Sequence, residues 1–247
     1  MAKPTRKIRA DLLLVEQGLA ESRSAAQRAI LAGQVRVGPD HVVRQSSETY
    51  PADTVLSLDS GPDFVSRGGG KLQPALDAHL PDLTGCVALD VGSSTGGFTD
   101  LMLQRGATRV YAVDVGTAQL HWKLRQDPRV VSLEQTNARY LTTEQIPEPI
   151  DIITSDVSFI SVTLVLPAAA ALLKPGGWAF ILIKPQFEAQ RHEAKKGVVR
   201  DEAVRQRTVD EVTAFAASQL AWRCLHIYPS PLLGPKGNQE FVAVFRS

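Results

Sequence analysis

From residue 85 onward, short apolar runs alternate with stretches of helical periodicity. The apolar runs are residues 86–90, 109–114, 130–133, 151–155 and 178–183. Strands that alternate with helices in this way predict an α/β fold, in which helices cover both faces of a mostly parallel sheet. No internal repeat or low-complexity segment interrupts this pattern.

The last two apolar runs break the alternation. Residues 223–228 and 240–245 are separated by a loop rich in proline and glycine, without a helical stretch. Two such strands predict a hairpin, so we expect the final strand to run antiparallel to the others, near the edge of the sheet. A mostly parallel, Rossmann-like sheet with one antiparallel strand is typical of methyltransferases that use S-adenosylmethionine.

The N-terminal region predicts a separate, small α+β unit. Two helices are expected over residues 9–17 and 25–31, followed by short strands at 34–38 and 54–58. The pattern R-x-D-x-x-L-x-x-x-G-x-x-x-S-R-x-x-A-x-x-x-I-x-x-G-x-V-x-V, from Arg9 to Val37, resembles the S-four RNA-binding domain. The resemblance implies that Arg9, Arg23 and Arg28 contact RNA phosphates, which position a protein without reading bases. The alternative is a solvated helical face.

The composition changes at Gly61-Pro62-Asp63, a sequence typical of a linker. We therefore predict an S-four-type domain over residues 1–60, a linker over 61–66 and an α/β domain over 67–247.

The overall composition excludes several classes of protein. The net charge is only +1, so no strong basic field covers the whole chain. Cys86 and Cys224 lack the spacing of metal ligands, and we expect both to be reduced core residues. A signal peptide is not predicted, because the N-terminal stretch contains only four consecutive apolar residues. A membrane span is not predicted either, because the longest apolar tract, around residues 160–173, is broken by Ser161, Thr163 and Pro167. We expect a cytoplasmic protein without a metal.

The segment VALDVGSSTGGFT, residues 87–99, carries an apolar strand into a glycine-rich turn and a helix. A dinucleotide site would require G-x-G-x-x-G to hold pyrophosphate, whereas this turn is G-x-x-x-G-G. S-adenosylmethionine has no phosphate, and its positive charges favour a nearby acid. The predicted cofactor-binding residues of this segment are Asp90, Gly92, Ser93, Ser94, Thr95, Gly96, Gly97 and Phe98.

The ends of the next two strands extend the predicted cofactor site. Asp114 ends the second apolar run, where a carboxylate can accept both hydroxyls of an adenosine ribose, and Val115 follows it. Asn137 and Ala138 follow the third run and are expected to contact the adenine. A surface aspartate at a strand end and a plain loop are the alternatives for these two positions.

The sequence SRGGGK, residues 66–71, looks like a phosphate-binding loop but is not one. The P-loop pattern G-x-x-x-x-G-K-[ST] fails at Val65 and at Leu72. Lys71 instead belongs with three other ionisable residues. These are Asp156, Lys184 and Glu240, which lie at the ends of predicted strands. Because ligands bind beyond the carboxyl ends of parallel strands, we expect these four side chains to converge.

The motifs VSRGGGKL, ALDVGSSTGGFTD, QTNAR, SDVSFIS, IKPQFE and GNQEF, behind an S-four domain, resemble the TlyA-type hemolysin/rRNA methyltransferases, relatives of FtsJ-like enzymes. The resemblance covers nearly the whole chain and implies ribose 2′-O-methylation of ribosomal RNA. It also implies that Lys71, Asp156, Lys184 and Glu240 are catalytic, that Asp156 borders the cofactor, and that Arg67 contacts RNA. Gly70 departs from the pattern, because a bulkier residue is expected there.

The expected chemistry is the removal of a proton from a weakly nucleophilic 2′-hydroxyl as it attacks a sulfonium methyl group. A lysine can act as the base only after losing its own proton, and a second cation nearby makes that loss easier. Lys184 is the candidate base, and Lys71 the group that tunes it and orients the hydroxyl. Asp156 and Glu240 are expected to hold the two ammonium groups.

Three alternatives are weighed against this function. A membrane-active hemolysin would need an amphipathic or spanning apolar segment, which the sequence lacks. A catalytically silent RNA-binding protein would have no need for four converging ionisable groups. A carbon-5 base methyltransferase would need a nucleophilic cysteine at the carboxyl end of a strand, and neither Cys86 nor Cys224 lies at one.

The basic stretch after residue 188 has two possible roles. Its cations are Arg191, Lys195, Lys196, Arg200, Arg205 and Arg207, and its acids are Glu188, Glu193, Asp201 and Glu202. These cations either extend an RNA path beside the active site or form a solvated face that the acids balance.

The resemblance also concerns the target. Family members with a further C-terminal helical extension act on both ribosomal subunits, and shorter members on the large subunit. Only Arg246 and Ser247 follow the last predicted strand, so we expect a cytidine of large-subunit rRNA to be modified. The sequence leaves the oligomeric state open and is compatible with a monomer.

Overall fold

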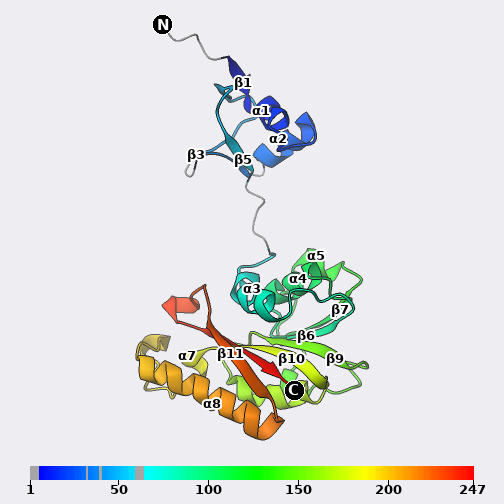
Figure 1. The fold of residues 1–247 in the computed structure, drawn as a ribbon, viewed down its shortest axis with the longest axis vertical. Coiled ribbons are helices and arrows are strands. Elements are labelled where there is room, and N and C mark those ends of the chain that lie inside the picture. The colour runs from blue at the N-terminus through cyan, green and yellow to red at the C-terminus, as the bar shows by residue number, and fades with distance from the viewer. Residues whose placement is uncertain (1–5, 32, 39–40, 59–63) are drawn as a thin grey trace. The chain divides into compact units, whose positions relative to one another are not determined.

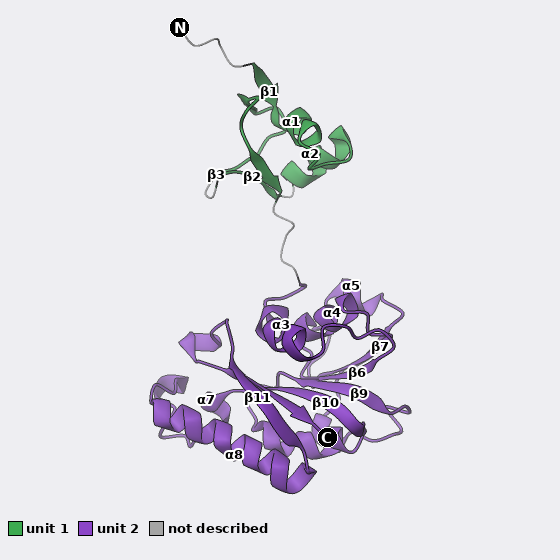
Figure 2. Cartoon of the chain, viewed as in Figure 1, with its two compact units in different colours: residues 1–63 green, residues 64–247 purple. Residues whose placement is uncertain are grey.

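The computed structural model describes residues 6–31, 33–38, 41–58 and 64–247. The chain divides into two compact units, residues 1–63 and residues 64–247 (Figure 2). The predicted linker sequence at residues 61–63 lies outside the described residues.

The first unit is a small α+β domain. Its elements are β1 (Lys7–Arg9), α1 (Ala10–Glu16), α2 (Arg23–Leu31), β2 (Val35–Val37), β3 (His41–Val42), β4 (Thr49–Pro51) and β5 (Leu56–Leu58). β1 pairs with β4, and β2 lies between β3 and β5. Leu13, Leu14, Ile30 and Val35 are buried in a core that belongs to this unit alone.

The second unit is built on a seven-stranded sheet with the order β11-β12-β10-β9-β6-β7-β8 (Figure 1). The strands are β6 (Val87–Val91), β7 (Arg109–Val113), β8 (Val130–Leu133), β9 (Ile150–Ser155), β10 (Leu173–Ile183), β11 (Arg223–Pro229) and β12 (Phe241–Arg246). β12 runs antiparallel to both β10 and β11. The predicted α/β class, with one antiparallel strand near the edge, is therefore confirmed.

Helices cover both faces of this sheet, as predicted. The helices are α3 (Gly68–His79), α4 (Gly97–Gln104), α5 (Trp122–Arg125), α6 (Leu166–Ala170), α7 (Pro185–Glu188) and α8 (Glu202–Leu220), with short 3-10 turns η1 (Ala138–Tyr140), η2 (Val162–Leu164), η3 (Lys195–Gly197) and η4 (Pro235–Gly237). Successive side chains of a strand point to opposite faces. Phe180 of β10 accordingly packs in the core under α3 and α4, whereas Ile181 packs in the core under α6 and α8.

The two cysteines differ from their expected placement. Cys86 precedes β6 and is half-buried, and Cys224 is exposed. The prediction that both are core residues is wrong for Cys224, because β11 is the edge strand of the sheet and leaves part of its length uncovered.

The second unit begins before the predicted boundary at residue 67. Phe64 is buried in the core under α3 and α4, and the Val65 backbone N–H donates to Asp100 Oδ2 at 2.8 Å. Residues 64–66 are thus part of the α/β unit, because an apolar side chain and a backbone hydrogen bond hold them on it.

The triple glycine of SRGGGK forms the first turn of α3. A Cβ atom at Gly97, the first residue of α4, would lie 2.8 Å from the Gly69 nitrogen and 3.1 Å from the Gly68 Cα. A Cβ atom at Gly69 would overlap the ring of Phe64, whereas one at Gly70 would meet only the end of the Leu232 side chain at 3.4 Å. The glycines therefore let α3 pack closely, and Lys71 is carried on its first turn.

Alanine substitutions at Gly69 and Gly70 are expected to have opposite effects on stability. Gly70→Ala should stabilise the protein by about 0.5–1 kcal/mol, because alanine favours a helix and its methyl group fits. Gly69→Ala should destabilise it by about 1–3 kcal/mol, because overpacking against Phe64 outweighs that gain. Chemical denaturation of both variants measures the difference, and equal midpoints for the two variants would contradict the packing argument.

Candidate active site

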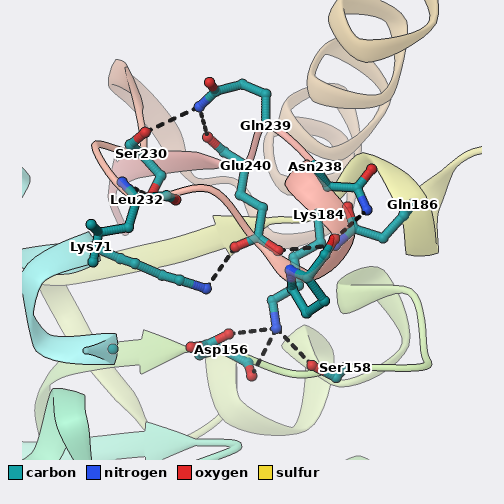
Figure 3. Close-up of polar contacts among 12 residues, drawn as sticks. Lys71, Asp156, Ser158, Lys184, Gln186, Ser230, Leu232, Asn238, Gln239 and Glu240 are labelled. Atoms are coloured by element: carbon teal, nitrogen blue, oxygen red, sulfur yellow. Dashed lines mark hydrogen bonds and ion pairs between the residues drawn. The ribbon is translucent and has the colours of Figure 1, made fainter. Parts of the chain in front are cut away.

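Four ionisable side chains from distant parts of the chain meet at one edge of the sheet (Figure 3). Lys71 Nζ lies 2.7 Å from Glu240 Oε2, and Lys184 Nζ lies 2.5 Å from Asp156 Oδ1. The exposed side-chain fraction is 7% for Lys71, 6% for Lys184, 0% for Glu240 and 22% for Asp156. The structure thus brings the predicted tetrad together as two ion pairs, in which Lys71, Lys184 and Glu240 are buried and Asp156 is partly exposed.

The topology explains this convergence. Asp156 follows β9 and Lys184 follows β10, so both lie at carboxyl ends of parallel strands, where α/β sheets bind ligands. Glu240 precedes β12, and the antiparallel direction of β12 puts its start at the same edge. Lys71 reaches this edge from the first turn of α3.

Two side chains without a predicted role hold the tetrad in place. Ser158 Oγ lies 2.7 Å from Lys184 Nζ, and Gln186 Nε2 donates to Glu240 Oε1 at 2.9 Å. Both belong to motifs that the sequence singled out, SDVSFIS and IKPQFE. They lie two residues after Asp156 and Lys184 in the sequence, and this closeness to two predicted site residues was the available signal.

Glu240 is also enclosed by the preceding loop. A Cβ atom at Gly234 would overlap Glu240 Oε1, so only glycine permits this approach of the loop. Gln239 Nε2 donates to the backbone carbonyls of Ser230 and Glu240 and fixes the start of β12 (Figure 3). Because this carboxylate is fully buried, it needs the partners that Lys71 and Gln186 supply.

Two adjoining hollows lie beside the tetrad. The first has a volume of about 270 Å³ and contains Lys71, Asp156 and Lys184 in its wall. The second has a volume of about 360 Å³ and is bordered by Asp114 and Asn137. Gly92, Ser94, Asp156 and Ser158 line both hollows, so the two spaces meet beside Asp156.

The predicted cofactor residues divide between these hollows. Asp90, Ser93, Thr95, Gly97 and Phe98 line the first, Asp114, Val115, Asn137 and Ala138 line the second, and Gly92, Ser94 and Asp156 line both. Gly96 lines neither hollow. It has a φ of 96°, and a Cβ atom there would overlap the side chain of Leu124, so Gly96 serves the packing of the turn on α5.

The carboxylate of Asp114 is held in a fixed orientation. The backbone N–H of Ser94 donates to Asp114 Oδ2 at 2.8 Å, and that of Gly116 donates to Oδ1 at 2.7 Å. Each oxygen still has a lone pair available towards the second hollow. This arrangement suits two neighbouring hydroxyl donors, such as those of a ribose.

Asp90 is a fully buried carboxylate in the wall of the first hollow. Thr99 Oγ1 donates to it at 2.7 Å and Thr154 Oγ1 at 2.9 Å. Burial raises the pKa of Asp90 to about 6, and the nearby Asp156 adds to the rise, while both threonine hydrogen bonds oppose it. A positively charged group entering the hollow would favour the ionised form.

Replacing Asp90 by asparagine is expected to stabilise the cofactor-free protein at pH 7. The folded-state pKa of about 6 lies above the ordinary value of 3.8 for an aspartate, so ionisation destabilises the fold progressively as the pH rises from about 4 to about 6. The cost at pH 7 is on the order of 3 kcal/mol. Thermal unfolding of both proteins between pH 4 and 8 measures it. The stability difference should vanish near pH 4, and a difference independent of pH would contradict this explanation.

Two of the predicted RNA-contacting arginines converge on a buried acid in the first unit. Arg9 Nη2 and Arg23 Nε each lie 2.9 Å from Asp11 Oδ2, and Gln27 Nε2 donates to the same oxygen at 2.9 Å. The hydrogen bond from Arg9 is the largest of the effects that hold the pKa of Asp11 well below its usual range. Arg28 is exposed on α2 nearby in the sequence.

Arg67 belongs to the second unit and is exposed at the start of α3. It lines the first hollow together with Lys71 and Lys184. Its position is therefore compatible with a contact to whatever substrate enters beside the tetrad.

Within the described residues, no group of three or more His, Cys, Asp or Glu side chains is arranged to hold a metal ion. Among the same residues, no helix combines the length and the apolar character needed to cross a bilayer.

Comparisons with known proteins agree with this architecture, which is that of the S-adenosylmethionine-dependent methyltransferase fold. Residues 64–247 match the model of the FtsJ-like methyltransferase family, and residues 8–47 match that of the S4 domain. The chain therefore belongs to the FtsJ-like methyltransferase family and carries an S4 domain, which confirms both resemblances seen in the sequence.

Individual relatives extend over nearly the whole chain. "Putative rRNA methyltransferase YqxC" of Bacillus subtilis is 46% identical over 96% of this chain and 85% of its own length. "16S/23S rRNA (cytidine-2'-O)-methyltransferase TlyA" of Mycobacterium tuberculosis is 44% identical over 98% of this chain and 91% of its own length. A solved structure called "Putative hemolysin from Streptococcus thermophilus" is 42% identical, with a TM-score of 0.73, over 99% of this chain and 90% of that one.

Proposed function

We propose that the protein transfers a methyl group from S-adenosylmethionine to the ribose 2′-hydroxyl of a cytidine in ribosomal RNA. The observation that carries this proposal is the convergence of two ion pairs, Lys71–Glu240 and Lys184–Asp156, beside the first hollow, which meets the second at Asp156. The substrate follows from the S4 domain and from the printed activity of the Mycobacterium tuberculosis relative.

The residues around the hollows suit the chemical groups of S-adenosylmethionine. Asp114 offers two oriented oxygens for the ribose hydroxyls, and Asn137 and Ala138 border the space beyond it for the adenine. Asp90 and the backbone at Gly92 face the first hollow, where a carboxylate favours an ammonium group. When bound, the cofactor supplies an electrophilic methyl group.

Lys184 and Lys71 act on the hydroxyl of the RNA. Asp156 and Ser158 fix Lys184 Nζ at the wall of the first hollow. Once Lys184 has released its own ammonium proton to solvent, its amine can accept the proton of the 2′-hydroxyl. Lys71 remains bound to Glu240 and orients the hydroxyl oxygen. A positioned base of this kind contributes roughly 100- to 10,000-fold to a rate.

The test is methyl transfer from labelled S-adenosylmethionine onto separated ribosomal subunits, with the modified nucleotide then mapped. A 2′-O-methylcytidine is expected. The same assay tests the narrower prediction that the large subunit is the preferred target, because it compares methyl incorporation into the two subunits. A membrane-active or catalytically silent protein would give no incorporation into either subunit. An rRNA substrate would place the protein in the cytoplasm.

A further inference from the structure

Two turns of the second unit share an unusual backbone. Lys196 has φ 55° and ψ 24° and is followed by Gly197 with φ 79°, and Lys236 has φ 60° and ψ 17° and is followed by Gly237 with φ 83°. Lysine in this left-handed region costs free energy, and such strained residues cluster at functional sites. We call η3 (Lys195–Gly197) and η4 (Pro235–Gly237) the lysine turns.

Asn238 ties the two lysine turns together. It is 2% exposed, and its Nδ2 donates to the backbone carbonyl of Gly197 at 2.8 Å and to that of Pro235 at 3.0 Å. Its Oδ1 accepts from the Val199 backbone N–H at 3.1 Å. Every hydrogen-bonding atom of this amide group is thus used to hold the turns side by side.

The lysine turns adjoin the catalytic tetrad. Pro235 lines the first hollow together with Lys71 and Lys184, and Gly234, just before it, touches the carboxylate of Glu240. Lys195, Lys196 and Lys236 are exposed. Lys236 Nζ donates to the backbone carbonyl of Lys196 at 3.2 Å, which leaves its other two N–H groups available.

The four acids between residues 188 and 202 bind partners other than the lysines of these turns. Ser161 and Val162 bind the Glu188 carboxylate. Arg207 binds that of Glu193. Asp201 caps α8 and Glu202 pairs with Arg205. In the part of the chain that the structure describes, no carboxylate forms an ion pair with Lys195, Lys196 or Lys236. The four acids of this stretch therefore form no ion pair with Lys195 or Lys196, its two lysines.

We propose that the lysine turns form a phosphate-binding rim, through which Lys195, Lys196 and Lys236 hold the RNA backbone next to the target nucleotide. This inference rests on the proposed function and names how that site holds its substrate. A 2′-hydroxyl can enter the hollow only if the adjoining phosphates lie just outside it, and these carry the charge that unpaired lysines attract. Asn238 holds the rim in a fixed position relative to Glu240, so binding of the backbone also sets the depth of the ribose.

The experiment compares wild type with the triple variant Lys195→Gln/Lys196→Gln/Lys236→Gln. Binding of an rRNA fragment is measured as a function of salt concentration, and methyl transfer is measured at near-physiological salt. The slope of log K against log salt is negative. Loss of three phosphate contacts should reduce its magnitude by about 2, at roughly 0.7 for each contact with a single strand. The KM for rRNA should rise at least about tenfold, with kcat within about twofold, because the lysines position the RNA without touching the reacting atoms.

The control is a triple variant with the same loss of charge, Arg109→Gln/Arg129→Gln/Arg223→Gln, whose exposed arginines begin or precede strands at the opposite edge of the sheet. It should keep the wild-type salt slope, and arginine at the three lysine positions should restore it. The same slope in wild type and in the lysine variant would overturn the inference. Because the slope is measured without catalysis, a protein that shows this slope change but methylates no subunit would contradict the proposed function and leave the rim supported.

Discussion

Lys184→Ala is expected to abolish methyl transfer to rRNA while cofactor affinity stays within a few-fold of wild type. Lys184 is the only one of the two lysines that contacts both Asp156 and Ser158, and it lies in the wall of the first hollow. Without its amine, no group at that position can accept the proton of the 2′-hydroxyl. The expected loss of rate is roughly 100- to 10,000-fold, measured in single-turnover assays with saturating cofactor.

Two matched variants isolate this effect. Asp114→Ala should weaken cofactor binding first, because it removes the oriented carboxylate of the second hollow. Lys174→Ala also removes a lysine that is paired with an acid, Asp151. Lys174 lies at the start of β10, whereas the tetrad lies beyond its other end, so this variant should keep the wild-type rate. If Lys184→Ala retained more than about a tenth of the wild-type rate, the assignment as general base would fail.

The positions of the tetrad were predictable because the rules of parallel sheets are strict. Asp156 and Lys184 follow apolar runs, and the carboxyl ends of parallel strands meet at one edge. The antiparallel direction of β12 could also be predicted, since no α-helix lies between β11 and β12. From these features, the convergence of Asp156, Lys184 and Glu240 could be expected. Lys71 lies on a helix before the first strand, and its place in the tetrad was expected through the resemblance to ribose 2′-O-methyltransferases.

Other parts of the site depend on contacts that a single sequence does not reveal. Glycine in a loop can mean approach to a ligand or close packing of protein atoms: Gly92 lines both hollows, but Gly96 faces Leu124. The partners of Ser158 and Gln186 depend on side-chain positions across the chain. The buried Asp11 similarly required the fold, because its three partners approach from β1 and α2.

Removing residues 1–63 is expected to leave a folded protein that binds cofactor but methylates rRNA poorly. Each unit has its own buried core, formed by residues such as Leu13 and Ile30 in the first and Leu76 and Phe180 in the second. All residues that line the two hollows belong to the second unit. Cofactor affinity and the melting temperature of the second unit should therefore change little.

Binding of rRNA should suffer much more from this truncation. The removed unit carries Arg9 and Arg23, whose guanidinium groups are oriented by Asp11 and are still 39% and 55% exposed. Phosphate contacts dominate affinity in such complexes and weaken with salt, so the loss should grow from low to physiological salt and reach roughly 100-fold or more in kcat/KM. The double variant Arg9→Gln/Arg23→Gln in the full chain should reproduce a large share of it. Full activity of the truncated protein at physiological salt would show that the S4 domain is not the anchor for rRNA.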